Sequence, residues 1–379
     1  MENFKEVFGY DYDSAYSTPA RLNLIGEHID YNGGLVMPAA ISLYIKGYFK
    51  KRKDNVIRLY SKNTKTLVEA SFDNLEYDEK RDWANYPIGM VYILKNKGLN
   101  IDKGFDIFFE SNIPLGSGLS SSAAILDLTC FIMSCEFKLD LDFKTIALYA
   151  CEAENKYCNL SSGIMDQMAI ALGRKNNAIL LNCATKDYEY IPFDFGKYRV
   201  AILQTNKKRS LTESKYNERV IECNEGLKIL KTKFNIDNLC QLRNKDLDTV
   251  KELIKDEKIY RRVRHVIKEN ERVYEFKKAL LDSDVKECGS ILNESHYSLR
   301  DDYEVTGLHL DTITDLARKS KYCLGSRMTG AGFGGCAIAI IEASKLEEFI
   351  NDVLPKYKEI TNTEGNIYLV DVVDGPKKI

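Results

Sequence analysis

The chain has 379 residues, of which 44% are hydrophobic and 29% charged, and its 54 lysines and arginines nearly balance 56 aspartates and glutamates, giving a net charge of −2. This length favours two domains with substantial cores, and the charge balance argues against nucleic-acid or anionic-lipid partners. No apolar run is long enough to span a membrane, and the N-terminus lacks the apolar core of a signal peptide. We therefore expect a cytoplasmic protein that binds small molecules.

Cysteine and histidine patterns argue against a structural metal. Ten cysteines occur without a Cys-x-x-Cys pair, and several have apolar neighbours, which favours reduced, buried thiols over disulfides or zinc. The four histidines, His28, His265, His296 and His309, are too scattered for a His-Glu-x-x-His motif. We expect no structural transition metal.

In chain order, the first half mixes strand and helix signals. Strand-like runs lie between residues 40 and 72 and at 106–109. Apolar residues at three- and four-residue spacing predict helices at about 86–97, 120–135 and 143–157. We expect residues 1–195 to form a mixed α/β domain.

The second half begins with a predicted strand, Tyr198–Gln204, and continues with long, charged amphipathic helices. These helices are predicted at about 213–233, 246–254, 258–282 and 284–295. Apolar runs at 336–341 and 367–373 indicate two further strands. With no linker or repeat visible, we place the domain boundary near residue 196, so that residues 196–379 form the second domain.

A glycine- and serine-rich segment, Pro114–Ala124, runs directly into a helix-forming stretch. Gly116 and Gly118 allow backbone N–H groups to approach a ligand closely, and Ser120 can cap the helix, whose N-terminus attracts anions. Phosphate is the natural ligand. Because no lysine follows in the Gly-x-x-x-x-Gly-Lys-Ser/Thr arrangement, a P-loop is excluded. A plain helix-opening turn remains an alternative for this segment taken alone.

A second glycine-rich segment, Gly330–Gly335, formally contains Gly-x-Gly-x-x-Gly. A dinucleotide-binding fingerprint must open a helix, whereas this segment precedes the strand-like run at 336–341. We interpret it as a tight turn beside a site, with an ordinary glycine-rich hairpin as the alternative.

Two polar clusters complete the candidate site. The segment Arg21–Gly34 carries an arginine, carboxylates, an imidazole and amides around turn glycines, which suits a hydroxyl-rich ligand, although a capped surface turn remains possible. In Glu152–Asp166, a helix ends near Asn159, and a serine–glycine turn delivers Asp166 into an apolar surround. Asp166 is either a general base or a helix cap.

Taken together, these segments carry a resemblance to a known family. The motifs occur in order and are distributed along nearly the whole chain. They are Ala20–Gly34, Trp83–Tyr86, Pro114–Ala123, Gly163–Gln167, Ser214–Arg219, Arg264–Val273, Glu294–Tyr303 and Arg327–Gly335. The sequence resembles the galactokinases, which are sugar kinases of the GHMP family. It departs from their usual pattern at Ala20, Ile29 and Asn155.

The resemblance implies an α+β protein with a two-domain GHMP-kinase-like fold. The N-terminal domain would be a mixed-sheet α/β domain, the C-terminal domain would be α+β, and the active site would lie in the cleft between them. The implied reaction is ATP- and Mg²⁺-dependent phosphorylation of α-D-galactose at its C1 hydroxyl, giving galactose 1-phosphate and ADP. A monomer is expected.

The resemblance also implies roles for individual residues. Asp166 would accept the hydroxyl proton, and Arg21 would keep that carboxylate ionised and stabilise charge on the γ-phosphate. The implied sugar contacts are Glu27, His28, Asp30, Gly163, Asp166 and Tyr216. The implied ATP contacts are Trp83 and Tyr86 near adenine, and Pro114, Leu115, Gly116, Ser117, Gly118, Leu119, Ser120, Ser121, Ser122 and Ala123 along the phosphates. Ser122 and Glu154 would bind Mg²⁺, with Ser121 as the alternative to Ser122.

Two other functions remain open. A related kinase acting on N-acetylgalactosamine or another pyranose would differ in the room beside C2 of the sugar. A non-catalytic sensor of galactose and ATP should have lost part of the phosphate loop or the base. Here the phosphate loop, Arg21 and Asp166 are all intact.

Overall fold

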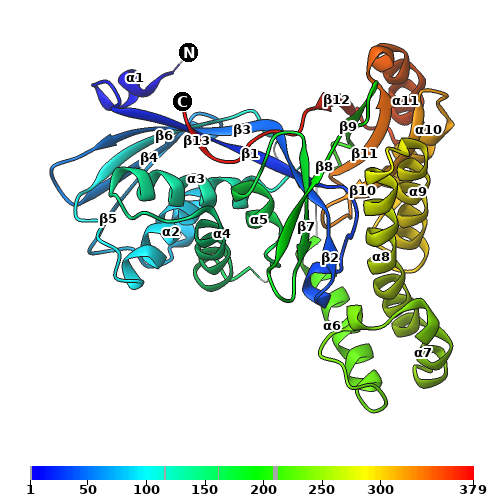
Figure 1. Ribbon diagram of the computed structural model, residues 1–379. Coiled ribbons are helices and arrows are strands. Elements are labelled where there is room, and N and C mark those ends of the chain that lie inside the picture. The colour runs from blue at the N-terminus through cyan, green and yellow to red at the C-terminus, as the bar shows by residue number, and fades with distance from the viewer. Residues whose placement is uncertain (1, 115–116, 161, 208–211) are drawn as a thin grey trace.

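A six-stranded sheet forms the centre of the first half of the protein (Figure 1). The computed structural model describes residues 2–114, 117–160, 162–207 and 212–379. The strands follow the order β13-β1-β3-β6-β4-β5, and all neighbours are antiparallel except β4 and β6. Their bounds are β1 (Ser14–Asn23), β3 (Pro38–Lys51), β4 (Val56–Ser61), β5 (Thr66–Ser71), β6 (Phe105–Ser111) and β13 (Lys377–Lys378).

Helices cover one face of this sheet (Figure 1). They are α2 (Asn85–Asn96), α3 (Ser121–Glu136), α4 (Phe143–Glu152) and α5 (Met165–Ala171). The central helix is α3, which packs on α2, α4, α5, β1 and β3, and its apolar sequence is buried on nearly every side. The Asp142 side chain caps α4 at the Thr145 N–H, and that helix continues into a π-helical turn, η3 (Ala153–Tyr157). The sheet and these helices therefore enclose the first core.

Shorter elements complete the first half. The helix α1 (Phe4–Phe8) begins with a capping box between Asn3 and Glu6. A three-stranded antiparallel sheet in the order β2-β7-β8 lies on the side of the second half. The remaining bounds are η1 (Asp30–Asn32), β2 (Leu35–Val36), η2 (Glu79–Ala84), β7 (Asn177–Asn182) and β8 (Tyr188–Pro192).

The second half is built on a four-stranded antiparallel sheet in the order β10-β11-β9-β12. The apolar strand β11 is buried almost throughout, because it lies between β9 and β10 and packs against helices. The strands are β9 (Tyr198–Gln204), β10 (Cys323–Thr329), β11 (Cys336–Glu342) and β12 (Asn366–Val370). The helices are α6 (Thr212–Leu230), α7 (Leu247–Leu253), α8 (Glu257–Leu281), α9 (Val285–Asp301), α10 (Leu308–Lys319) and α11 (Leu346–Thr361), with short 3-10 turns η4 (Leu239–Gln241), η5 (Asn244–Asp246) and η6 (Ala343–Lys345).

The predicted helices and the strands at 198–204, 336–341 and 367–373 are confirmed within a few residues, with three differences. The helix predicted at 143–157 is an α-helix followed by a π-helical turn, and the helix predicted at 284–295 extends to Asp301. Strands β1, β2, β7, β8, β10 and β13 and helices α1, α5, α10 and α11 were not predicted. The chain passes from β8 to β9 around residue 196, yet its last strand, β13, pairs with β1 in the first sheet. The domain boundary at residue 196 remains a prediction.

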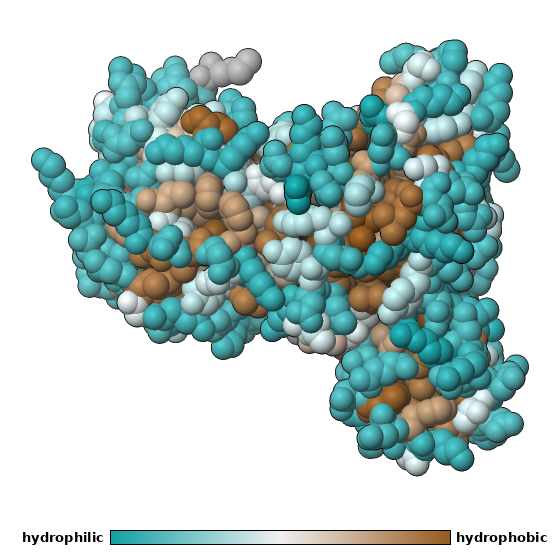
Figure 2. Space-filling view, in the orientation of Figure 1, coloured by the Kyte–Doolittle hydropathy of each residue, from teal (hydrophilic) through white to brown (hydrophobic). Residues whose placement is uncertain are grey.

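The surface and the thiols agree with the composition. On the face seen in Figure 2, hydrophilic residues cover most of the surface and hydrophobic residues appear in separate patches. Within the described ranges, no helix is both long and apolar enough to cross a membrane. Cys130, Cys223, Cys240, Cys288 and Cys336 are buried, as predicted, whereas Cys135 is exposed, and the reduced state of the thiols remains a prediction.

Candidate active site

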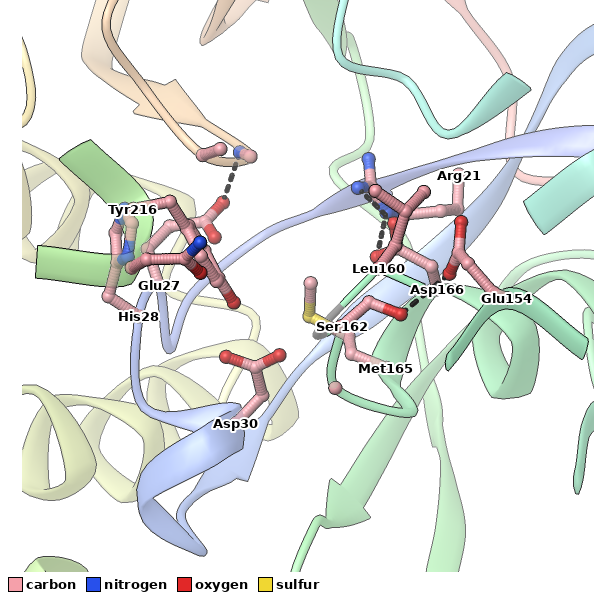
Figure 3. Close-up of a pocket in the computed structure, with 14 residues that line it drawn as sticks. Arg21, Glu27, His28, Asp30, Glu154, Leu160, Ser162, Met165, Asp166 and Tyr216 are labelled. Carbon is pink, nitrogen blue, oxygen red and sulfur yellow. Dashed lines mark hydrogen bonds and ion pairs between the residues drawn. The ribbon is translucent and has the colours of Figure 1, made fainter. Parts of the chain in front are cut away.

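A cavity of about 360 Å³ lies where the two halves of the protein meet. Polar groups gather at two ends of it, Arg21, Asp166 and Glu154 at one and Glu27, His28 and Tyr216 at the other, with Asp30 between them in the view of Figure 3. The lining residues are Arg21, Glu27, His28, Asp30, Glu154, Leu160, Ser162, Gly163, Met165, Asp166, Tyr216, Asn217, Gly330 and Ala331. The structure thus places the site in the predicted cleft and brings together most of the predicted sugar, base and metal residues.

Asp166 is held by a two-pronged ion pair. Arg21, on β1, donates from Nε to Asp166 Oδ1 at 2.6 Å and from Nη2 to Oδ2 at 2.7 Å, and the Ser120 hydroxyl also donates to Oδ2. The Arg21 side chain is almost fully buried, whereas 28% of the Asp166 side chain remains exposed. A buried guanidinium that binds through two N–H groups fixes both charge and orientation. The carboxylate is therefore oriented and still reachable from the cavity.

Three sequence interpretations are wrong at this point. Ser120 occupies the N-cap position of α3, but its φ of 61° is left-handed, and its side chain makes no capping hydrogen bond because it is turned toward Asp166. Asp166 is not the cap of α5 either, since Ile164 holds that position. The surround of Asp166 is polar on the side of Arg21 and Ser120, not apolar as predicted.

The predicted phosphate loop is the glycine- and serine-rich segment Pro114–Ala124, which follows β6 and leads into α3. The first helical bond of α3 runs from the Ala124 N–H to the Ser120 carbonyl at 2.9 Å, so the N–H groups of Ser121, Ser122 and Ala123 have no acceptor within the helix. Such N–H groups, together with the helix dipole, form an anion site. Pro114 lies at the start of the loop, and Leu119 donates its N–H to the Ser117 hydroxyl at 3.4 Å. The predicted contacts Leu115 and Gly116 lie outside the described residues.

The two glycine-rich segments meet at Gly118. The Gly118 carbonyl accepts a hydrogen bond from Arg21 Nη1 at 2.9 Å. A Cβ added to Gly330 would lie 3.1 Å from the same oxygen. The segment after Gly330 leads into β11, as predicted, so it is a hairpin turn between β10 and β11 that lies beside the site.

Glu154 offers a candidate metal ligand. It is buried in the π-helical turn η3, and its Oε2 accepts hydrogen bonds from the Ser162 hydroxyl and from Gln167 Nε2, both at 2.7 Å. This leaves Oε1 available, and α3, which carries Ser122 in its first turn, packs against η3. No group of three or more His, Cys, Asp or Glu side chains in the described ranges could hold a metal ion. A hydroxyl and one carboxylate suit Mg²⁺ bound mainly through phosphate oxygens and water.

Glu27 is fixed by donors from the second half of the chain. Its Oε1 accepts from the Gly330 N–H at 2.9 Å, from the Thr329 hydroxyl at 3.0 Å and from Arg327 Nη2 at 3.3 Å. Arg327 and Thr329 were not predicted to be site residues, although the motif Arg327–Gly335 was a signal for them. Because Glu27 is only 2% exposed and paired with buried Arg327, it can present a charged, oriented acceptor to a ligand.

Burial shifts the pKa values of His28 and Asp30 in opposite directions. Burial, reinforced by His265, lowers the pKa of His28 to about 3, so this imidazole is neutral near pH 7. Burial and the charge of Asp166 raise the pKa of Asp30 to about 7. A Cβ added to Gly163 would lie 2.2 Å from Asp30 Oδ2, so only glycine allows this close approach. The Tyr216 ring, on α6, lies 5.7 Å from the His28 ring.

The two predicted adenine contacts do not line the cavity. Trp83 donates from Nε1 to the Thr66 hydroxyl at 2.8 Å, and its ring packs 5.7 Å from that of Phe109 on β6. Burial raises the pKa of Tyr86 to about 12, and the nearby charge of Glu154 adds to the shift. Both residues therefore lie on the side of α2 and β6, and their contact with adenine remains a prediction.

The geometry supports one kind of chemistry. An oriented carboxylate and an end rich in hydrogen-bonding groups face the same cavity, and the start of α3 lies beside it, because Ser120 donates to Asp166. Such a site can hold a phosphate ester beside a hydroxyl compound and remove the hydroxyl proton.

Comparisons with known proteins agree with this geometry. Family models match residues 85–174 as a GHMP kinase N-terminal domain, residues 276–358 as a GHMP kinase C-terminal domain, and residues 2–50 as a galactokinase galactose-binding signature. Galactokinases of Fusobacterium nucleatum and Clostridium acetobutylicum are each 45% identical to the chain, over 100% of its length and 98% of theirs.

Solved structures extend the match to three dimensions. The crystal structure of Lactococcus lactis galactokinase complexed with galactose is 41% identical, with a TM-score of 0.96, over 99% of this chain and 98% of that one. A mevalonate kinase with 19% identity and a TM-score of 0.68, covering 96% of this chain and 100% of that one, shares the fold. The chain therefore belongs to the GHMP kinase family, within its galactokinase branch.

Proposed function

We propose that this protein transfers the γ-phosphoryl group of ATP to the C1 hydroxyl of α-D-galactose, giving galactose 1-phosphate and ADP. The observation that carries the proposal is the Asp166–Arg21 pair, which lies in one cavity between the start of α3 and the polar segment that holds Glu27 and Asp30. The full-length similarity to galactokinases and the galactose-binding signature over residues 2–50 support the choice of sugar.

In this proposal Asp166 accepts the proton of the C1 hydroxyl as that oxygen attacks the γ-phosphorus. Arg21 holds the carboxylate in place and, because its guanidinium faces the phosphate loop through Gly118, offsets negative charge on the transferring group. The N–H groups at the start of α3 hold the ATP phosphates. Positioning and charge stabilisation are the main protein contributions to phosphoryl transfer.

The proposal includes Mg²⁺ held by Ser122 and Glu154. The residues fit this ion, because both supply hard oxygen donors and Glu154 keeps one carboxylate oxygen free of protein donors in the described ranges. When bound, the ion would neutralise phosphate oxygens. Ser122→Ala and Glu154→Gln should each raise the Mg²⁺ concentration needed for half-maximal rate, with a double variant less than additive. Unchanged metal dependence in both variants would place the ligand elsewhere, with Ser121 as the next candidate.

Sugar recognition is proposed to rest on Glu27, His28, Asp30, Gly163 and Tyr216. Glu27 and Asp30 would accept sugar hydroxyl protons, and Gly163 allows the Asp30 carboxylate to lie against its backbone. A site that pairs particular hydroxyls discriminates against epimers, because a mismatched hydroxyl leaves a buried group unpaired at a cost of about 1–3 kcal/mol.

An ADP-release assay across a sugar panel tests the function. We expect galactose to be turned over with kcat/KM about tenfold or more above that of glucose, whose C4 hydroxyl points away from its partner. A preference for N-acetylgalactosamine would instead indicate an N-acetylgalactosamine kinase, and sugar binding without ADP release would indicate a sensor. Equal turnover of galactose and glucose at low concentration would contradict the proposal. The monomeric state and the cytoplasmic location remain predictions.

A further inference from the structure

A chain of hydroxyl and thiol groups leads from His28 into the second half of the protein. His28 Nδ1 lies 3.0 Å from the Tyr31 hydroxyl, which lies 2.7 Å from the Tyr303 hydroxyl, which in turn lies 3.1 Å from Cys223 Sγ. Tyr303 follows α9 and is fully buried, and Cys223 is a buried residue of α6. None of Tyr31, Tyr303 and Cys223 lines the cavity. These three groups can therefore act on a ligand only through residues that line the cavity, which are His28 and Tyr216, whose ring lies 5.3 Å from that of Tyr31.

His28 itself faces the cavity. Its Nε2 is buried and makes no hydrogen bond of ordinary geometry within the described part of the chain, although the backbone of Ala331, which also lines the cavity, interacts with the ring. A buried nitrogen without a partner is costly unless a ligand supplies one. The backbone of His28 has a left-handed φ of 62°, a conformation that side-chain-bearing residues adopt at a cost and that is common at functional sites.

The neutral His28 imidazole carries hydrogen on only one of its two nitrogens. Burial holds the pKa of His28 far below its ordinary value, so the imidazole is neutral and carries hydrogen on one nitrogen only. If Nδ1 carries it, the ring presents an acceptor to the cavity, and if Nε2 carries it, the ring presents a donor. The partner of Nδ1 decides between these two tautomers.

The relative acidities of these groups favour one direction for the hydrogen bonds that join them. A phenol, with a pKa of about 10, is a much stronger acid than a neutral imidazole N–H, and an imidazole nitrogen is a much stronger base than a phenol oxygen. The better-matched bond therefore runs from the Tyr31 O–H to His28 Nδ1. Tyr303 then donates to Tyr31 and the Cys223 thiol donates to Tyr303, so that each bond strengthens the next.

We propose that Tyr31, supported by Tyr303 and Cys223, fixes His28 in the tautomer that carries hydrogen on Nε2, and that this donor sets the affinity for galactose. The assignment complements the rest of the cavity, because the nearby groups Glu27 and Asp30 are carboxylates that accept from sugar hydroxyls, whereas His28 then donates to a sugar oxygen. Tyr31 and Tyr303 are positioning residues. The affinity part rests on the proposed function, but the tautomer part does not.

The tautomer can be measured without sugar. In protein labelled with ¹⁵N-histidine, the nitrogen that carries hydrogen and the bare nitrogen give well-separated resonances. The chain has only four histidines, and a His28→Asn variant assigns the signals of His28. We expect hydrogen on Nε2 in the unsubstituted protein. Hydrogen on Nδ1, or an even mixture, would overturn the proposal whatever the substrate is.

Three matched substitutions test the link to affinity. Tyr31→Phe should produce a mixture of His28 tautomers and raise KM for galactose about three- to tenfold with kcat within about twofold. Tyr303→Phe should keep the tautomer and raise KM about two- to fourfold, because Tyr31 loses its orienting donor but can still donate. The control is Tyr357→Phe, which removes a buried hydroxyl that donates to the Thr205 carbonyl at 2.7 Å and should change neither property.

Two results would overturn the affinity part. Tyr31→Phe with unchanged KM would show that the tautomer does not set sugar affinity, and Tyr357→Phe with an equally raised KM would show a general effect of losing a buried hydrogen bond. If no sugar is phosphorylated at all, the proposed function fails while the resonances of His28 still decide the tautomer.

Discussion

The regions of the cavity around Asp166 and around Asp30 use the same side-chain type in opposite ways. In the first region, Asp166 receives two N–H groups from Arg21 and the hydroxyl of Ser120. In the second region, which lies between the two ends of the cavity, the Asp30 carboxylate is bonded by backbone groups of Asp30 and Tyr31, no side chain of the described residues donates to it, and Gly163 packs closely against it. Side chains of the protein thus complete the surroundings of Asp166, whereas Asp30 is left with room for donors from a ligand.

Electrostatics set Asp30 apart as well. Burial, and then the negative charge of Asp166, raise the pKa of Asp30 to about 7. A carboxylate that serves as a base at neutral pH must be ionised and oriented, while one that recognises hydroxyls can gain its stabilisation from them. The comparison therefore favours a chemical role for Asp166 and a recognition role for Asp30, in line with the proposed function.

The largest effect should come from removing the base. Asp166→Asn keeps the shape but cannot accept the proton, so we expect kcat to fall about 10²- to 10⁴-fold. Calorimetric titration should still detect galactose and an ATP analogue. A variant with near-native kcat would show that Asp166 has only a structural role and would end the distinction between the Asp166 and Asp30 regions.

The next largest effect should come from Arg21→Lys. Lysine keeps the positive charge but loses the two-pronged contact with Asp166 and the bond to the Gly118 carbonyl, so we expect kcat to fall about 10- to 100-fold. The matched control is Arg199→Lys, at an exposed arginine 3.8 Å from Asp371, which should leave steady-state kinetics unchanged. Native kcat/KM in Arg21→Lys would remove this residue from the mechanism.

The pH dependence of kcat/KM tests the role of Asp30. Because its raised pKa keeps Asp30 neutral below about pH 7 and ionised above, kcat/KM for galactose should rise through this pH and be about tenfold below its plateau one pH unit lower. Asp30→Asn should lower the plateau and flatten the profile in this range. A profile that keeps its shape in Asp30→Asn would assign the titration to another group.

The smallest effect concerns the glycine beside Asp30. A methyl group at position 163 would lie 2.2 Å from Asp30 Oδ2, so Gly163→Ala must turn that carboxylate aside. We expect KM for galactose to rise a few-fold, with kcat and KM for ATP close to native, since losing one hydrogen bond costs about 0.5–1.5 kcal/mol. If KM for ATP rises equally, the substitution disturbs the cavity as a whole.

Local patterns in the sequence account for most of the fold. Periodic apolar spacing predicts α6, α7, α8 and α9, and the apolar run at 336–341 predicts β11, because apolar side chains in these patterns become buried against neighbouring elements. The helices α10 and α11 and the long strand β1 were missed. The short strands β7 and β8 were missed, and so was β10, whose sequence Cys-Leu-Gly-Ser-Arg-Met-Thr has no strict alternation. Its pairing with β11 supplies the stability that its own pattern does not indicate.

The site was predicted as a set of residues but not as a set of contacts. Arg21 and Asp166 could be named from motifs, but the partners of Glu27 lie some 300 positions away, at Arg327 and Thr329. Ser120 was given the wrong partner, because serine before a helix usually caps it. Its left-handed backbone turns the hydroxyl toward Asp166, and only the tertiary structure shows this.

The pairing of β13 with β1 has a consequence for how the protein folds. Lys377 and Lys378 lie opposite Ser17 and Tyr16, so one edge of the first sheet is covered by a segment that follows the entire second half in the sequence. Before this pairing forms, β1 offers unpaired backbone groups that can join another chain. The first half therefore cannot complete its sheet from its own residues alone.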